Sequence, residues 1–242
     1  MTKRILDIVD MQVDFMRADG KLAVPGADAL IARTNDFFHA LPKKAFDFAL
    51  FKYDTHFADE YPRSPESQSF PNIHCEYGTT GWGLAVDADA LKGKMPIHYM
   101  TKNTFNMWED NPLSDATKLK FANPTERAAY DNLYFIGNDR QAVKGMMLRD
   151  EFMNALRLDK DVEVTLIGVA SDFCVHDAIL GYLQRGARVR VVEDLVTGIG
   201  TPVPGRAPSG NIRDVLDLEV FRPYVKKGQV TLVQSQNVLR PH

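Results

Sequence analysis

The chain contains little cysteine and no long apolar run, and these two features argue against a disulfide-rich protein and against a membrane-spanning one. Its two cysteines, Cys75 and Cys174, lie far apart, so a disulfide framework is not indicated. No apolar run approaches the roughly 20 residues that a membrane-spanning helix needs. The opening stretch, MTKRILDIVD, lacks the apolar core of a signal peptide. We therefore expect a cytoplasmic protein in a reducing setting, with no membrane partner.

Clustered positive charge is also missing. The chain has 29 Lys and Arg against 32 Asp and Glu, a formal net charge of −3, and no lysine- or arginine-rich block. A nucleic-acid surface needs grouped positive charges that displace the counterions of the phosphates, so nucleic acid is not expected as a partner. The remaining composition is ordinary for a soluble globular protein, with 45% hydrophobic residues. The sequence does not determine the number of subunits, so a monomer and a homo-oligomer are both compatible with it.

Six short apolar runs, rich in β-branched or aromatic residues, are typical of buried strands. They cover residues 4–10, 46–53, 96–101, 162–169, 187–193 and 229–233. Helical patterns lie between them at 27–41, 143–158 and 174–185, and Gly186 follows the last one where a helix-ending glycine belongs. Strands that alternate with helices predict a single α/β domain over residues 1–242. Its doubly wound, mostly parallel central sheet would have about six strands, with helices on both faces.

Two stretches do not follow this alternation. Residues 57–82 are polar, rich in Pro, Gly and Ser, and long for a plain connection, which favours a functional loop. Residues 107–142 are poorly patterned and are a candidate insertion.

The strongest chemical signal is the stretch GVASDFCV. A strand ends here, a turn of small residues follows, and Cys174 stands at the start of a helix. Free backbone N–H groups and the helix dipole at such a position lower a thiol pKa, and the same amides can bind an oxyanion. A cysteine that only packs in the core is the alternative.

Two charged residues follow other predicted strands. Asp10 ends the first strand, and Lys102 follows the strand at 96–101. Catalytic groups gather beyond the carboxyl ends of parallel strands. At this edge Asp10 could exchange a proton with the thiol, and the ammonium of Lys102 would favour the thiolate. Taken singly, a helix-capping aspartate and a solvated lysine are the more ordinary explanations.

A pattern of metal ligands begins where the second strand ends. Asp54 and His56 point to the same side of the chain, and His74 follows in the loop at 57–82. One carboxylate and two imidazoles with open positions are typical of a catalytic divalent metal, with zinc expected before iron or manganese. Glu66 or Glu60 could supply a further ligand, and surface histidines are the alternative.

Together these motifs resemble the isochorismatase-like cysteine hydrolase family. The resemblance is carried by DMQVDF from residue 10, TKNTF from residue 101, GVASDFCV from residue 168 and VVEDL from residue 191. It implies a catalytic triad of Asp10, Lys102 and Cys174. It also implies a cis peptide before Ala170 and an oxyanion hole formed by the backbone amides of Ala170 and Cys174.

Within that family, the metal loop resembles the nicotinamidases. This branch implies a cysteine amidohydrolase that acts on a small linear carboxamide and hydrolyses nicotinamide to nicotinate and ammonia through a thioester. A divalent metal would hold the pyridine nitrogen of the substrate. Its implied ligands here are Asp54, His56 and His74, with Glu66 as a further one.

The chain also departs from the nicotinamidase pattern. Phe15 and Phe70 take the places of the aromatic residues that line the substrate ring, but Phe70 stands where a tryptophan is usual. Two alternatives therefore stay open. One is another amidohydrolase of the family, acting on a ureido or carbamoyl substrate. The other is a non-catalytic metal-binding or redox-sensing domain that uses Cys174 as its sensor.

Overall fold

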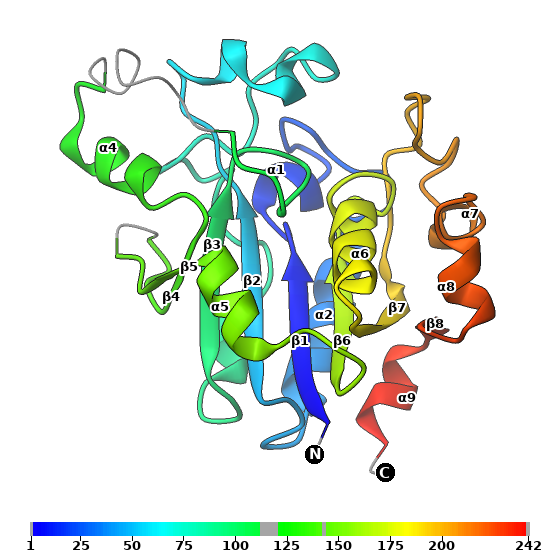
Figure 1. Cartoon of the computed structure of the whole chain (residues 1–242). Helices are drawn as coiled ribbons and strands as arrows, with labels where there is room; N and C mark the ends of the chain where they lie inside the picture. The colour runs from blue at the N-terminus through cyan, green and yellow to red at the C-terminus, as the bar shows by residue number, and fades with distance from the viewer. Residues whose placement is uncertain (1, 112–120, 142–143, 241–242) are drawn as a thin grey trace.

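The computed structural model describes residues 2–111, 121–141 and 144–240, which form one eight-stranded sheet with helices around it (Figure 1). The strands follow one another across the sheet in the order β5-β4-β3-β2-β1-β6-β7-β8. Their bounds are β1 Lys3–Val9, β2 Phe48–Asp54, β3 Ile97–Lys102, β4 Phe135–Gly137, β5 Met147–Leu148, β6 Val162–Gly168, β7 Arg188–Val196 and β8 Val230–Val233. The α/β class predicted from the sequence is confirmed.

The six strands predicted from apolar runs form the parallel part of the sheet. β1 pairs with β2 and β6, β2 with β3, β6 with β7, and β7 with β8, all in parallel. β2 is buried along its whole length, and β1 over its last five residues. Burial on both faces explains why these strands are near-continuous apolar runs rather than alternating ones.

The sheet has more than the expected six strands because β4 and β5 extend it beyond β3. Both of their pairings are antiparallel. With three and two residues, they are too short to leave a periodic signal. β5 also corrects the helix predicted at 143–158: Met147 pairs with β4, so the helix there, α5, spans only Arg149–Leu156. Residues 112–120 and 142–143, from the candidate insertion and the predicted helix, lie outside the described residues.

The helices lie on both faces of the sheet. In Figure 1, α2 lies behind the sheet, whereas α5 and α6 lie in front of it. The bounds of the remaining helices are α1 Val13–Met16, α2 Asp28–Ala40, α4 Pro124–Asp131, α6 Cys174–Gln184, α7 Ile212–Leu216, α8 Arg222–Lys226 and α9 Ser235–Leu239. Short 3₁₀ turns lie at Tyr61–Arg63, Pro65–Gln68 and Ala88–Leu91. The helices predicted at 27–41 and 174–185 are present as α2 and α6.

The helix α6 ends as its sequence indicates. Gly186 has a φ of +97°, a left-handed conformation that glycine adopts at little cost. Its N–H donates to the carbonyl of Leu183, and the N–H of Ala187 donates to the carbonyl of Tyr182. These two bonds make a Schellman motif, which satisfies the last carbonyls of the helix that Cys174 begins.

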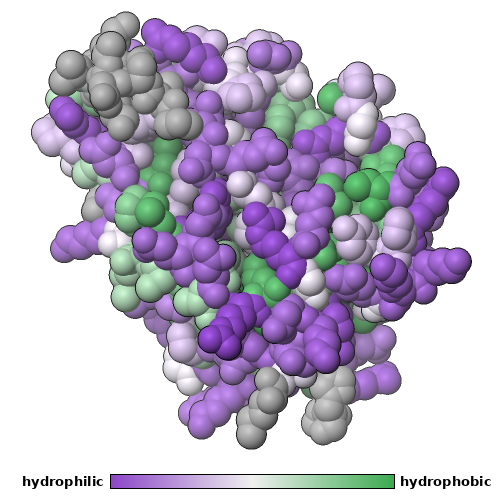
Figure 2. All heavy atoms as spheres, viewed as in Figure 1, coloured by the Kyte–Doolittle hydropathy of each residue, from purple (hydrophilic) through white to green (hydrophobic). Residues whose placement is uncertain are grey.

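The surface is mostly hydrophilic in the view of Figure 2, and apolar residues gather only in small separate areas. Large apolar side chains that are exposed include Met146, Met147 and Leu148 near the β5 edge. No helix in the described part of the chain is long and apolar enough to cross a membrane.

Candidate active site

Four neighbouring strands deliver the predicted catalytic and metal-binding residues to one edge of the sheet. β3, β2, β1 and β6 lie side by side, and their carboxyl ends carry Lys102, Asp54, Asp10 and the turn before Cys174. Asp54 and Lys102 are direct partners in the β2–β3 register, so they stand at the same level of the sheet. In Figure 1 the loop at 57–82 covers this end of the strands.

Asp10, Lys102 and Cys174 come together in a buried group. The Nζ atom of Lys102 lies 2.9 Å from Oδ2 of Asp10 and 3.5 Å from Sγ of Cys174. The side chains of Asp10 and Lys102 are 0% and 1% exposed, and Cys174 is 5% exposed. One ammonium thus contacts both an acid, which directly follows β1, and a thiol, which begins α6.

Burial governs the protonation of this group. It raises the pKa of the Asp10 carboxyl, an effect that the charge of Lys102 opposes and the charge of Asp54 reinforces. Burial also raises the pKa of the Cys174 thiol well above its usual value, again against the opposing charge of Lys102. The lowered thiol pKa expected from the helix position is therefore wrong for the free protein. A thiol in this state needs a base beside it, and Asp10 stands there.

The turn between β6 and α6 shapes the surroundings of the thiol. The peptide between Val169 and Ala170 is cis, as the resemblance implied. Within the described residues, the backbone N–H groups of Ala170 and Cys174 find no hydrogen-bond acceptor. The carboxylate of Asp172 holds the turn against the following loop, accepting the N–H groups of Ile199 at 3.0 Å and Gly200 at 2.7 Å. The turn that leads to Cys174 therefore carries two backbone donors without a partner in the described part of the chain.

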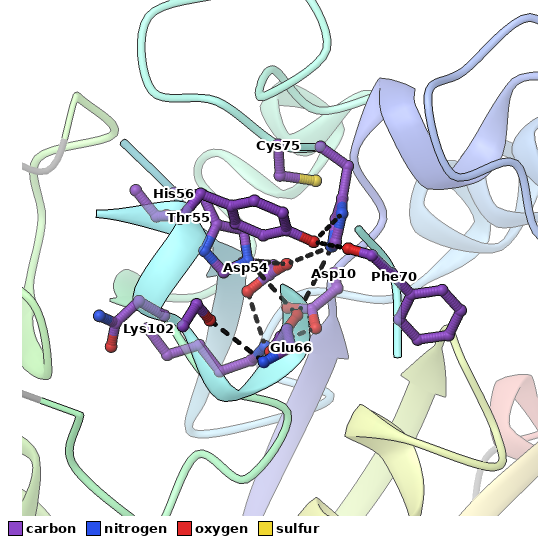
Figure 3. A network of polar contacts seen from close by, with 12 residues as sticks. Asp10, Asp54, Thr55, His56, Glu66, Phe70, Cys75 and Lys102 are labelled. Atoms are coloured by element: carbon purple, nitrogen blue, oxygen red, sulfur yellow. Dashed lines mark hydrogen bonds and ion pairs between the residues drawn. The ribbon is translucent and has the colours of Figure 1, made fainter. Parts of the chain in front are cut away.

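A second buried group surrounds Asp54. Asp54, His56, Glu66 and His74 each offer one ligand atom, and these atoms all lie within 4.8 Å of one another. Nε2 of His56 lies 3.1 Å from Oδ2 of Asp54 and 3.3 Å from Oε2 of Glu66. Nε2 of His74 lies 3.3 Å and 3.5 Å from the same two oxygens. Figure 3 shows Asp54, His56 and Glu66 turned toward this common point.

These separations fit a divalent cation. Bonds of about 2.1 Å would set neighbouring ligand atoms about 3.0 Å apart in an octahedron and about 3.4 Å apart in a tetrahedron. Three of the four nitrogen–oxygen separations, at 3.1, 3.3 and 3.3 Å, fall within that range, and the fourth, at 3.5 Å, lies just above it. All four side chains are 0% exposed, and buried carboxylates need a cation close by. Imidazole and carboxylate donors suit zinc, iron or manganese.

The two groups share Asp54. Its Oδ2 faces the two histidines, while its Oδ1 lies 3.5 Å from Nζ of Lys102. Figure 3 shows Asp10, Asp54 and Lys102 side by side at this junction. A bound cation and the ammonium would therefore act on opposite oxygens of a single carboxylate.

Phe15 and Phe70, the predicted ring-lining residues, both lie against His74. Their ring centroids are 5.3 Å and 6.3 Å from that of the imidazole. Phe70 also contacts Phe105 and Phe173, with centroids 5.9 Å and 5.4 Å away. The sequence reasoning missed these last two rings, although their places shortly after the predicted lysine and directly before the predicted nucleophile could have revealed them.

Tyr61 was also missed. Its hydroxyl donates to the carbonyl of Phe70 and lies 3.2 Å from Nδ1 of His74. Its ring packs edge-on against His56, with centroids 4.6 Å apart. Nothing in the local sequence distinguishes this tyrosine from other loop residues.

The chain is similar to known proteins both in sequence and in structure. No family model matches the chain. In sequence, it is 26% identical over 207 residues to a curated nicotinamidase/pyrazinamidase of Mycobacterium tuberculosis, across 81% of this chain and 87% of that protein. In structure, it is similar to a zinc complex of the pyrazinamidase of Pyrococcus horikoshii, with a TM-score of 0.55, 23% identity, and 96% and 99% of the two chains covered. The chain has the isochorismatase-like hydrolase fold.

An N-carbamoylsarcosine amidase of Thermoplasma acidophilum is similar to the same degree. Its TM-score is 0.55 at 18% identity, and the match covers 96% of each chain. The resemblance drawn from the motifs is thus confirmed, in sequence by a nicotinamidase and in structure by proteins of the isochorismatase-like fold.

Proposed function

We propose that this chain is a cysteine amidohydrolase that hydrolyses nicotinamide to nicotinate and ammonia. The observation that carries the proposal is the position of Asp54, with one oxygen toward Lys102 and the other toward His56 and His74. Because Asp54 joins the catalytic group to the metal group, a thiol that attacks a carboxamide and a cation that holds a ring nitrogen would act on the same small molecule. The sequence similarity to the nicotinamidase/pyrazinamidase of Mycobacterium tuberculosis supports the same chemistry here.

Asp10 acts first as a base. Its carboxylate removes the proton from Sγ of Cys174, and the ammonium of Lys102, 3.5 Å from the sulfur, stabilises the thiolate that forms. The thiolate attacks the carboxamide carbon, and the carbonyl electron pair moves onto oxygen. The free N–H groups of Ala170 and Cys174 receive this oxyanion.

Asp10 then acts as an acid. It gives its proton to the carboxamide nitrogen as the C–N bond breaks, so that ammonia leaves and a thioester remains. Asp10 next takes a proton from water, whose oxygen attacks the thioester carbon. The C–S bond breaks, the proton returns to the thiol, and nicotinate leaves. A raised pKa suits Asp10 for both directions of transfer.

The second group would bind the substrate. Asp54, His56, Glu66 and His74 would hold the divalent ion, with zinc expected before iron or manganese. When bound, the ion supplies a Lewis-acidic site for the pyridine nitrogen. Phe15 and Phe70, packed against one of these ligands, would line the ring, and residues 57–82 would serve as the metal and substrate loop of one domain spanning residues 1–242.

A second candidate is an amidohydrolase that acts on a ureido or carbamoyl substrate, because the N-carbamoylsarcosine amidase has the same fold. The four-ligand group favours nicotinamide, since a carbamoyl group has no ring nitrogen for a cation to hold. A redox sensor fits less well, because sensor thiols are accessible and low in pKa, whereas Cys174 is 5% exposed.

The test is ammonia release from nicotinamide by the purified protein, before chelation, after chelation, and after zinc is returned. We expect metal-dependent release. His56→Ala should raise KM strongly, whereas His39→Ala, at a side chain that is 64% exposed, should not. Release from N-carbamoylsarcosine but not from nicotinamide would favour the second candidate, and release from neither would refute the amidohydrolase.

A further inference from the structure

The metal group has one close neighbour that the mechanism leaves unused, the carboxylate of Glu60. Its side chain is buried, and its Oε2 lies 3.5 Å from Nδ1 of His56. Apart from this contact, neither atom has a hydrogen-bond partner in the described part of the chain. Two buried polar atoms that face only each other should pair, because each would otherwise remain unsatisfied.

The local chain explains why Glu60 lies under this ring. The N–H groups of Glu60 and Tyr61 both donate to the carbonyl of Phe57, so the loop turns back directly after His56. The backbone of His56 is held as well, because it bonds to the carbonyl of Cys75 and to the N–H of Tyr77. Ring orientation is therefore the freedom that remains to His56, and Glu60 is placed to restrict it.

Glu60 is itself held from the other side. Nδ2 of Asn103 donates to its Oε1 at 3.0 Å, and Nδ2 of Asn111 approaches the same oxygen at 3.5 Å. The hydroxyl of Tyr134 donates to Oδ1 of Asn103 at 2.6 Å, which fixes the orientation of that amide. Asn103 directly follows Lys102, so one segment supplies both the ammonium at the thiol and the support for Glu60.

The second histidine has weaker support. Nδ1 of His74 faces the hydroxyl of Tyr61 at 3.2 Å and the carbonyl of Asn72 at 3.3 Å, both neutral acceptors. Only His56 faces a carboxylate at its second nitrogen. A carboxylate at that nitrogen fixes the tautomer and strengthens the metal bond of the first nitrogen.

We propose that Glu60, held by Asn103, is a positioning residue for metal binding: it accepts Nδ1–H of His56 and keeps the lone pair of Nε2 on the metal. This inference rests on the metal-binding role proposed above for His56. Glu60 itself stays outside the coordination sphere.

The experiment is a titration of the metal-free full-length protein with Zn²⁺ against a coloured competing chelator, and with Co²⁺ by its visible absorption. Glu60→Gln should weaken Zn²⁺ binding about 10- to 100-fold, the usual effect of removing such a partner, and should alter the Co²⁺ spectrum. Asp59→Asn removes the same charge from an exposed neighbour and should leave the zinc Kd within about twofold.

Two further outcomes make the result decisive. If Glu60→Gln does not fold, Asn103→Ala, which removes the amide that holds Glu60 and leaves Glu60 and His56 themselves unchanged, should still weaken Zn²⁺ binding several-fold. Unchanged Zn²⁺ affinity in whichever of these variants folds, even with lowered stability of the metal-free protein, overturns the inference. A wild-type protein that binds no Zn²⁺ overturns the metal assignment and this inference together, whereas equal binding by wild type and variants overturns only the latter.

Discussion

Replacing Lys102 by Met removes the single ammonium of the buried catalytic group and keeps most of its volume. The Nζ atom lies 2.9 Å from Asp10, 3.5 Å from Asp54 and 3.5 Å from Cys174, and the side chain is 1% exposed. Two unit charges at 2.9 Å attract by about 6 kcal/mol at an effective dielectric constant of about 20. The desolvation of Lys102 offsets part of this, and removing one partner of a buried pair typically costs about 3–5 kcal/mol.

The stability that Lys102→Met loses should depend on pH, and the pKa of Asp10 sets the direction of this dependence. Burial already raises the pKa of Asp10, and Lys102 is the main influence that opposes it, so the variant should raise this pKa further. A carboxyl whose folded-state pKa lies above its unfolded value of about 3.8 lowers the stability of the fold as the pH rises from the unfolded-state value to the folded-state value. The deficit of Lys102→Met should therefore be large at pH 8 and shrink toward pH 5, by up to about 1.4 kcal/mol per pH unit.

Urea unfolding of the metal-free wild type and variant at pH 5 and pH 8 measures this difference. Lys92→Met, at a side chain that is 68% exposed, is the control and should change stability by less than about 0.5 kcal/mol. At neutral pH the variant should also lose about 10²–10⁴-fold in kcat/KM, because a protonated Asp10 cannot deprotonate the thiol. A deficit that is equal at both pH values, or below about 1 kcal/mol at pH 8, would refute the reasoning.

Three further outcomes are expected. Cys174→Ala should reduce ammonia release by about 10⁴-fold or more, and residual turnover above a few per cent would exclude the thioester route. The kcat/KM of the wild type should fall on the acid side with an apparent pKa above about 4, the ordinary value of an aspartate, because burial raises the pKa of Asp10. An apparent pKa at or below that value would argue against Asp10 as the base. Gly168→Ala should lower the free energy of unfolding by at least about 1–3 kcal/mol, and the urea midpoint with it, because φ is +124° and a Cβ would stand 2.0 Å from the carbonyl oxygen of Val9; an unchanged midpoint would contradict this close approach.

The sequence could predict the parts of the site that local rules control. Parallel strands gather catalytic groups at their carboxyl ends, so Asp10, Asp54 and Lys102 could be assigned to one edge once their strands were recognised. The β2–β3 register, which sets Asp54 directly beside Lys102, was not predicted and comes from the structure.

Long-range packing decided what the sequence could not predict. β4 and β5 exist because they pair with each other and with β3, and two or three residues carry no periodic pattern of their own. The thiol pKa was expected to fall because the helix terminus was visible in the sequence, whereas the burial that raises it depends on the surrounding fold. Glu66, which the sequence offered beside Glu60 as a further ligand, joins the metal group from a 3₁₀ turn that the sequence did not predict.

The charges of the whole site give a further reason to expect a divalent ion. Four carboxyl groups, those of Asp10, Asp54, Glu60 and Glu66, are 0% exposed here, and Lys102 is the ammonium among them. Buried charges persist only when opposite charges or protons compensate them. Lys102 balances one negative charge and a divalent cation would balance two, which leaves one negative charge uncompensated. Burial raises the pKa of Asp10, so this carboxylate readily takes up a proton, as the base that receives the proton of Cys174 must.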